Sequence, residues 1–343
     1  MNEQEKKDLL QQIQSRMTGD RVQDTAILEE EINKLEGQEN ANEIADELLQ
    51  MAYGMITDEE QAYLQKTLYI DGKSLSHIYA ETSDLMRKGN RAEALKLSRA
   101  LYEHILMHFR ESDTERFFSF RNPFESNLYH ILYHPTKRLI KTPFDFTLYI
   151  GAHAYNLVEA GRAPEAIPVL KEAIRFNPVN PDPRFELAEV YKLTGDNDKL
   201  FETVMDTLPI CTSAYAISRC YSNLGFWCVN TKDYESAVRF YYESLNFADH
   251  PAIAGELKHI EVLSGKPLVP PTKEMINKAF AKYEIYHGPG QEVLHVAHEL
   301  AKQAKEAGQL REEAFYLNII VSLIHDDEAQ IRLNEIVAQL SAE

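Results

Sequence analysis

Two pairs of histidines have the spacing that brings both rings to one side of a helix. His104 and His108 are four residues apart, and so are His130 and His134. Side chains at this spacing are neighbours on a helix, so a metal ion can bridge them. Zinc sites need further ligands, however, and neither pair has a cysteine or a committed carboxylate beside it. We therefore expect no metal site and no cofactor, with a zinc ion bridging one of the pairs as the alternative.

The sequence lacks the short motifs that mark common active sites. It contains no GxxxxGK[ST] phosphate loop, no GxGxxG, no GxSxG nucleophile turn and no HExxH zinc motif. Catalysis would need a nucleophile, a base and an orienting group, and the sequence does not group such residues together. We expect a protein that is not an enzyme.

The charge is strongly negative and unevenly distributed. The 343 residues contain 36 Lys and Arg against 54 Asp and Glu, a net charge of −18. Residues 1–70 carry 16 acidic and 6 basic side chains, so 6 minus 16 places −10 in this segment alone. Such a balance repels phosphate backbones, and we expect no nucleic-acid partner.

Three features bear on the cellular compartment. The longest apolar run, Phe315 to His325, is too short to cross a bilayer, and the N-terminus shows no apolar signal segment. Three cysteines form an odd set without a CxxC motif, which is typical of reduced thiols. We expect a cytoplasmic protein without a membrane contact, and the oligomeric state stays open.

The chain is organised around residues 147–181, which read as two amphipathic helices. Gly161 marks the tight turn between them, and Pro178 follows the second helix. Small residues stand where the two helices would cross, namely Ala154, Ala166 and Ala173. Pro168 interrupts this pattern, because a proline within a helix removes a backbone hydrogen bond.

Parts of the same pattern recur in segments 75–110, 181–207, 219–250 and 291–326. Equivalent second-helix positions are 72, 34 and 37 residues apart, at Ala94, Ala166, Leu200 and Ala237. This pattern resembles the tetratricopeptide repeat (TPR), a helical hairpin with a period of 34 residues, in a divergent form. The longest spacing predicts one irregular repeat between the first two copies.

The resemblance implies an all-α fold, a right-handed α-α superhelical solenoid of TPR-like helical hairpins. We expect this solenoid over residues 71–343, with the irregular repeat at 109–146 and a C-terminal capping helix at 327–341. Residues 1–70 would form an acidic N-terminal helical extension or cap, with helices at 3–17, 22–36 and 39–56. Thr57 and Glu60 form a capping box that predicts a fourth helix.

The segment 109–146 is rich in aromatic residues and locally basic, with six Lys and Arg against four Asp and Glu between 110 and 141. Ser112 and Glu115 form a second capping box, which predicts a helix start. Aromatic and arginine residues dominate binding hot spots, so this segment is one candidate surface. Its candidate residues are Phe117, Phe118, Arg121, Phe124 and Tyr133. The alternative is that these aromatics only pack a non-standard repeat.

The second candidate surface comes from the TPR resemblance, in which first helices line a concave groove that holds a peptide. Carried over position by position, the groove residues are Tyr155, Glu189, Lys192, Arg219, Asn223, Phe226 and Asn230. As alternatives, a C-terminal helix or the long loop at 264–272 fills this groove.

We therefore expect a non-catalytic scaffold or adaptor that binds a protein or peptide partner in the groove. The alternative is a bacterial peptide-responsive regulator, because an N-terminal helical bundle followed by TPRs is similar in layout to the Rap family. In that family, a peptide in the groove changes how the bundle engages a second protein.

Overall fold

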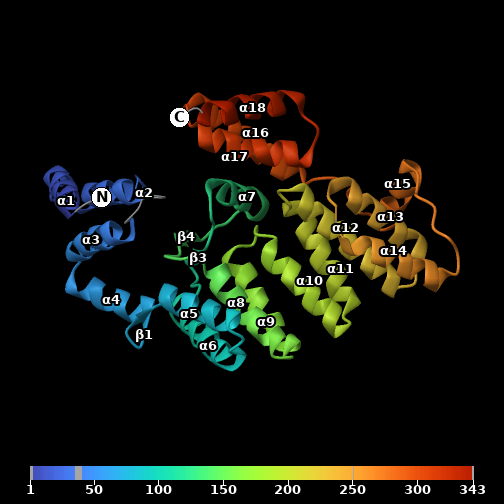
Figure 1. Ribbon diagram of the computed structural model, residues 1–343, viewed down its shortest axis with the longest axis horizontal. Coiled ribbons are helices and arrows are strands. Elements are labelled where there is room, and N and C mark those ends of the chain that lie inside the picture. Colours follow the sequence, from blue (N-terminus) through green and yellow to red (C-terminus); the bar gives the residue numbers. More distant parts are fainter. Residues whose placement is uncertain (1–2, 35–40, 250, 342–343) are drawn as a thin grey trace. The chain divides into compact units, whose positions relative to one another are not determined.

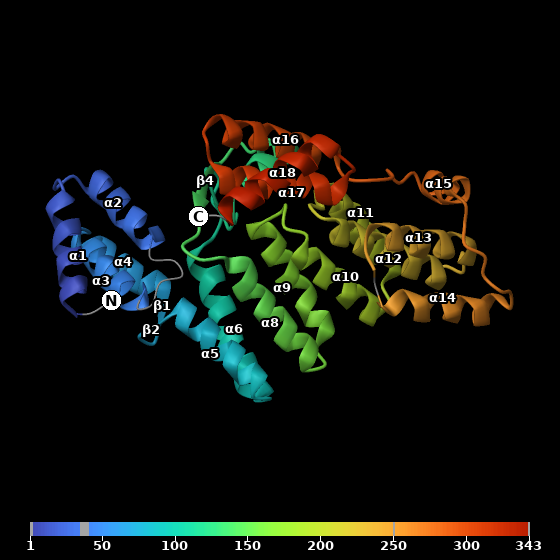
Figure 2. The ribbon, with the colours of Figure 1, turned by 45° about the horizontal axis from the view of Figure 1, so that its top comes forward.

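The computed structural model describes residues 3–34, 41–249 and 251–341, and almost all of its elements are helices (Figures 1 and 2). The chain divides into two compact units, residues 1–75 and residues 76–343. In the described part of the chain, no helix is long and apolar enough to cross a membrane. The fold is all-α, with two small two-stranded sheets as its β-structure in the described residues.

Unit 1 is a small helical bundle with its own core. The predicted helices are observed as α1 (Glu3–Arg16), α2 (Arg21–Lys34), α3 (Ala41–Gly54) and α4 (Asp58–Leu68), while residues 35–36 and 39–40 of the predicted ranges lie outside the described residues. The core is built from Ile13, Leu28, Ile44 and Leu48. The Thr57–Glu60 capping box is also confirmed, since Thr57 accepts from the Glu60 backbone and Glu60 accepts from the Thr57 backbone.

A short hairpin that the sequence analysis did not predict closes unit 1. Strands β1 (Tyr69–Ile70) and β2 (Lys73–Ser74) pair antiparallel. Asp71 and Gly72 between them have φ values of 49° and 79°. An Asp-Gly pair with two positive φ values is the preferred connection of a two-residue hairpin.

Unit 2 contains the predicted helical hairpins, and each one packs against the next. The pairs are α5 (Leu75–Arg87) with α6 (Arg91–His108), α8 (Phe146–Glu159) with α9 (Ala163–Phe176), α10 (Asp182–Thr194) with α11 (Asn197–Thr207), and α12 (Ala214–Asn230) with α13 (Tyr234–Phe247). The second helix of one pair packs on the first helix of the next: α6 on α8, α9 on α10 and α11 on α12. Each pair thereby covers an apolar face that it could not bury alone.

The predicted small-residue positions lie in these helix seams. Ala94, Ala166, Ala173 and Ala237 are fully buried, and Ala154 is 2% exposed. Gly161 adopts φ 73°, the left-handed conformation that a tight turn after a helix requires. Helix α9 runs on through Pro168, whose side chain is exposed.

Between α6 and α8 the chain leaves the stack and forms a β–α–β unit. Strands β3 (Glu115–Phe118) and β4 (Arg138–Lys141) pair in parallel, and α7 (Pro123–Tyr133) connects them. The prediction that a helix starts at Ser112 was wrong. The Glu115 N–H does donate to Ser112 Oγ at 3.0 Å, but the chain then enters a strand. Because α6 packs directly on α8, this segment is an excursion from the stack rather than a helical hairpin within it.

The C-terminal helices form a further layer. They are α14 (Pro251–Ser264), α15 (Lys273–Lys282), α16 (Gln291–Glu306), α17 (Leu310–Leu323) and α18 (Asp327–Leu340). Helix α16 packs on α7 and on the short 3₁₀ helix η1 (Leu208–Ile210). A helix is present where the C-terminal capping helix was predicted, namely α18, and Arg332 joins it to α17 through two hydrogen bonds to Glu313.

Candidate binding surface

The first helices of three successive pairs present a surface of exposed and half-exposed side chains, which we call the α8–α10–α12 face. Leu148 and Tyr155 lie seven residues apart on α8, and each is 54% exposed. Seven residues are about two helical turns, so both side chains point to the same side. Helices α10 and α12 add Glu186, Glu189, Lys192, Leu193, Tyr215, Arg219, Phe226 and Asn230.

Two cation–aromatic contacts join α10 to α12 across this face. The Arg219 guanidinium lies over the Phe185 ring at 4.2 Å, and Lys192 Nζ lies 5.2 Å from the centre of the Phe226 ring. Such contacts contribute about 0.5–1 kcal/mol each at exposed sites. Lys192 also forms a salt bridge of 2.8 Å with Glu189. These side chains are therefore held in place before any partner arrives, which lowers the entropy lost on binding.

The face is electrostatically mixed. The carboxyl of Glu186 is open to solvent, yet desolvation by the surrounding protein raises its pKa, and the positive charge of Arg219 opposes this shift. Asn230 donates through Nδ2 to Asn197 Oδ1 at 2.9 Å. A surface with acidic, cationic, amide and aromatic groups side by side can accept both the backbone and the side chains of an extended peptide.

One predicted groove residue is not on this face. Asn223 is only 3% exposed, and its Nδ2 is buried without a hydrogen-bond partner. Its neighbour Trp227 packs on Phe201 at 4.5 Å between ring centres. The side chain of Asn223 therefore belongs to the packing of α12 more than to an open surface, which its spacing from Arg219 could not reveal.

The aromatic residues of the β–α–β unit mainly pack the unit itself. Phe124 is 1% exposed, so it is a core residue and not a contact for a partner. Phe117 packs edge-on against Phe109, and Phe118 packs against Phe120. Of the predicted set, Tyr133 stays open, with 44% of its surface exposed.

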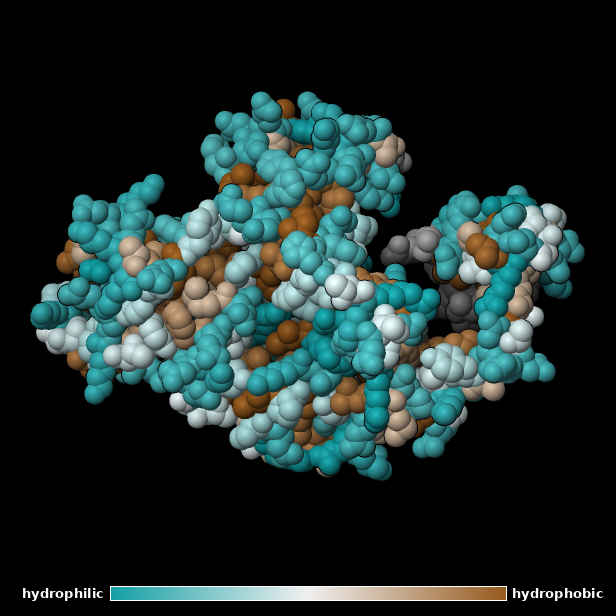
Figure 3. All heavy atoms as spheres, turned by 180° about the vertical axis from the view of Figure 1, so that it is seen from behind, coloured by the Kyte–Doolittle hydropathy of each residue, from teal (hydrophilic) through white to brown (hydrophobic). Residues whose placement is uncertain are grey.

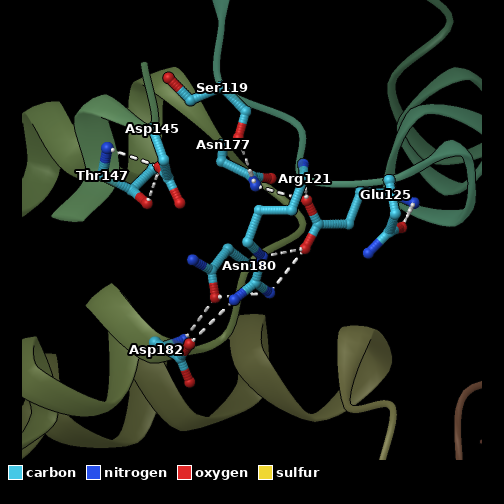
Figure 4. A network of polar contacts seen from close by, with 9 residues as sticks. Ser119, Arg121, Glu125, Asp145, Thr147, Asn177, Asn180 and Asp182 are labelled. Atoms are coloured by element: carbon cyan, nitrogen blue, oxygen red, sulfur yellow. Dashed lines mark hydrogen bonds and ion pairs between the residues drawn. The ribbon is translucent and has the colours of Figure 1, made fainter. Parts of the chain in front are cut away.

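Arg121, the remaining predicted residue of the β–α–β unit, lies in a polar network that Figure 4 shows from close by. Its Nε donates to Glu125 Oε1 at 2.7 Å, and its backbone N–H donates to Glu125 Oε2 at 2.7 Å. Its two terminal nitrogens reach Asp182 Oδ2 and Asn180 Oδ1, both at 3.3 Å. The network joins α7 to the start of α10, so it brings the β–α–β unit next to one end of the α8–α10–α12 face.

The histidine pairs differ from each other in the structure. The rings of His104 and His108 lie close on α6, with centres 4.4 Å apart. His130 lies on α7, but His134 follows the end of that helix in a left-handed conformation, with φ 44°. Among the described residues, no group of three or more His, Cys, Asp or Glu side chains could hold a metal ion.

A serine and a histidine do meet in the interior, and the sequence analysis did not predict this. Ser98 Oγ and His153 Nδ1 are 3.0 Å apart, but Ser98 is fully buried and His153 is 3% exposed. Burial lowers the pKa of His153 to about 4, so the ring is neutral at pH 7. A substrate cannot reach this pair, so the contact joins α6 to α8 and does not form a nucleophile–base site.

The sequence analysis did not predict two exposed residues of the α8–α10–α12 face. Leu148 precedes Tyr155 by two helical turns, and Tyr215 precedes Arg219 by one turn. Their helical phase relative to predicted groove residues was the signal that could have identified them.

The space-filling view from behind is mostly hydrophilic, with hydrophobic residues showing in its hollows (Figure 3).

Comparisons with known proteins add no relative. No protein-family model matches the chain, and a search of curated proteins finds no match.

Proposed function

We propose that this protein is a non-catalytic scaffold or adaptor whose α8–α10–α12 face binds an extended segment of a protein partner. We further propose that its helical pairs are divergent TPR-like hairpins that follow a right-handed superhelix with this face on the concave side. The free, buried cysteines Cys211, Cys220 and Cys228 fit a reducing compartment such as the cytoplasm.

The observation that carries the proposal is the combination of open apolar side chains and fixed polar ones on one face. Tyr155 and Tyr215, each 54% exposed, offer aromatic area that a partner would remove from water. Arg219 and Lys192 are already held by Phe185 and Phe226, so they are poised for backbone carbonyls or carboxylates. The C-terminal helix α16 packs on α7 and η1, and the loop at 264–272 lies against α13 and α14. These placements support a face that a partner can reach.

Site-specific photo-crosslinking tests this proposal. A benzophenone amino acid is placed at position 155 or 215, and at position 315 as the control. Phe315 is 45% exposed on α17, and it is not one of the residues of the α8–α10–α12 face. In cells, we expect a discrete adduct from positions 155 and 215, and its loss when Arg219→Glu is added. Equal adducts from all three positions, or adducts from position 315 alone, would refute the proposal.

The regulator hypothesis is the second candidate, and the division of the chain supports it. Residues 1–75 form a separate compact unit with a core of their own, as a movable effector bundle requires. The test is energy transfer between dyes at two exposed positions, Val22 in unit 1 and Leu193 on α10. A peptide that binds the α8–α10–α12 face should change the transfer efficiency. If the bound peptide does not change the transfer efficiency, the regulator hypothesis is contradicted and only the scaffold proposal is left.

A further inference from the structure

A second concave site is lined by residues other than those of the α8–α10–α12 face. Helices α14 and α15 each pack on α13, and the linker 265–272 between them spans the space that they leave. The result is a hollow of about 670 Å³, which we call the α13–α15 hollow. Its volume falls within the range of roughly 300–1,000 Å³ that is typical of small-molecule sites.

The walls of the α13–α15 hollow are largely apolar and only partly covered. Val238 and Ile260, with 8% and 0% exposure, form its buried wall. Leu263, Val269 and Met275 also line it but stay 44%, 76% and 40% exposed. Single exposed apolar side chains are common on protein surfaces, but several of them gathered around one hollow are a feature of binding sites.

The hollow is preformed by specific fastenings. The linker contains three prolines, which restrict its backbone, and the Leu268 N–H donates to Glu261 Oε1 at 3.0 Å. At the other side, Asp233 accepts from Lys282 Nζ at 2.7 Å and from the Tyr283 hydroxyl, which ties α15 to the start of α13. Burial raises the pKa of Asp233, but these hydrogen bonds and those from Ser236 outweigh it and lower the pKa to about 2.

The charges around the hollow are unbalanced. Its two acidic residues are engaged, Asp233 with Lys282 and Glu235 with Arg239 at 3.0 Å. Two lysines that line the hollow, Lys232 and Lys266, form no ion pair with any residue in the described part of the chain. An apolar hollow with two uncompensated ammonium groups is complementary to a molecule with an apolar body and an anionic head.

We propose that the α13–α15 hollow binds an amphiphilic carboxylate, with its hydrocarbon chain between α13, α14 and the linker and its head group at Lys232 and Lys266. This site is independent of the partner surface proposed above.

Calorimetry on the full chain tests the proposal, with dodecanoate below its critical micelle concentration as the probe. Dodecylamine and dodecanol have the same chain with a cationic and a neutral head. We expect dodecanoate to bind at one site and dodecylamine to bind at least about tenfold more weakly, a difference of roughly 1.4 kcal/mol. The double variant Lys232→Ala/Lys266→Ala should weaken the binding of dodecanoate by a similar factor and leave the binding of dodecanol unchanged.

A matched pair of substitutions on α14 locates the site. Leu263→Glu places a charge in the hollow and should abolish binding. Val262→Glu changes its equally apolar neighbour, which is 76% exposed and outside the lining of the hollow, and should leave binding intact. Circular dichroism confirms that both variants are folded. Equal binding of dodecanoate and dodecylamine, equal effects of the two substitutions, or no binding at all would each overturn the proposal.

Discussion

Asn177 donates through Nδ2 to Oε2 of Glu125 at 2.8 Å, although the two residues are 52 positions apart in the chain. The same Nδ2 also donates to the Ser119 carbonyl at 3.1 Å. Both side chains are buried, so this contact fixes the β–α–β unit to the segment that leaves α9. The carboxylate of Glu125 is the centre of the network, since Arg121 and Asn177 both donate to it (Figure 4).

The first prediction concerns this network. Arg121→Ala removes the cation and leaves the buried Glu125 carboxylate with fewer donors, so we expect the free energy of unfolding to fall by roughly 2–3 kcal/mol. The control is Arg138→Ala, which breaks an exposed pair with Glu115 and should cost under about 1 kcal/mol. Urea unfolding of both variants makes the measurement. Equal losses would mean that the network is no more than a surface ion pair.

The second prediction separates two helical glycines. A Cβ at Gly225 would lie 2.9 Å from the Tyr241 ring, whereas a Cβ at Gly151 would meet nothing within 4 Å. Gly225→Ala should destabilise the protein by about 1–3 kcal/mol, because the seam between α12 and α13 has no room for a methyl group. Gly151→Ala should stabilise it by up to about 1 kcal/mol through helix propensity. Thermal unfolding distinguishes the two, and a stabilising Gly225→Ala would contradict the proposed packing.

A third prediction tests how the C-terminal helices are held. A Cβ at Gly290 would lie 2.3 Å from the Pro209 carbonyl oxygen, which is backbone and cannot rotate away. Gly290→Ala should therefore push the start of α16 off η1, and amide hydrogen exchange in α16 should speed up while exchange in α8 and α9 stays unchanged. Gly255→Ala, where a Cβ meets nothing within 4 Å, is the control. Unchanged protection of α16 would show that this contact does not hold the layer.

The fourth prediction follows from the neutral His153. Its pKa is about 4 in the folded protein and 6.5 in the unfolded chain, so the unfolded chain binds one more proton between these values. Stability should therefore fall as the pH drops from 6.5 towards 4, by up to about 1.4 kcal/mol per pH unit from this residue. The measurement is urea unfolding at pH 7, 6 and 5. The free energy of unfolding should depend less steeply on pH in His153→Gln than in the unsubstituted protein. His325→Gln, with a side chain that is 92% exposed, should keep the original slope. Parallel slopes for all three proteins would argue against a buried neutral ring.

Much of the helical layout followed from short-range pattern. Ala166 and Ala173 each lie three or four residues from Val169 and Leu170, which is helical spacing, and both alanines are fully buried. Helix α7 begins at Pro123 with Asn122 as its cap, two residue types that commonly start a helix. Such signals are readable because a cap, a tight turn or an amphipathic helix depends on residues only a few positions apart.

The sequence by itself therefore determined the helical hairpins and the small residues at their seams. The tertiary structure decided what short-range pattern cannot specify. Ser112 Oγ accepts the Glu115 N–H in a way that can open a helix, but parallel pairing with β4 selects a strand. Phe124 and Asn223 have the residue types of a binding surface, yet packing buries both. Pairing and burial depend on which distant surfaces meet, and that information lies in the whole folded chain and not in the spacing of neighbours.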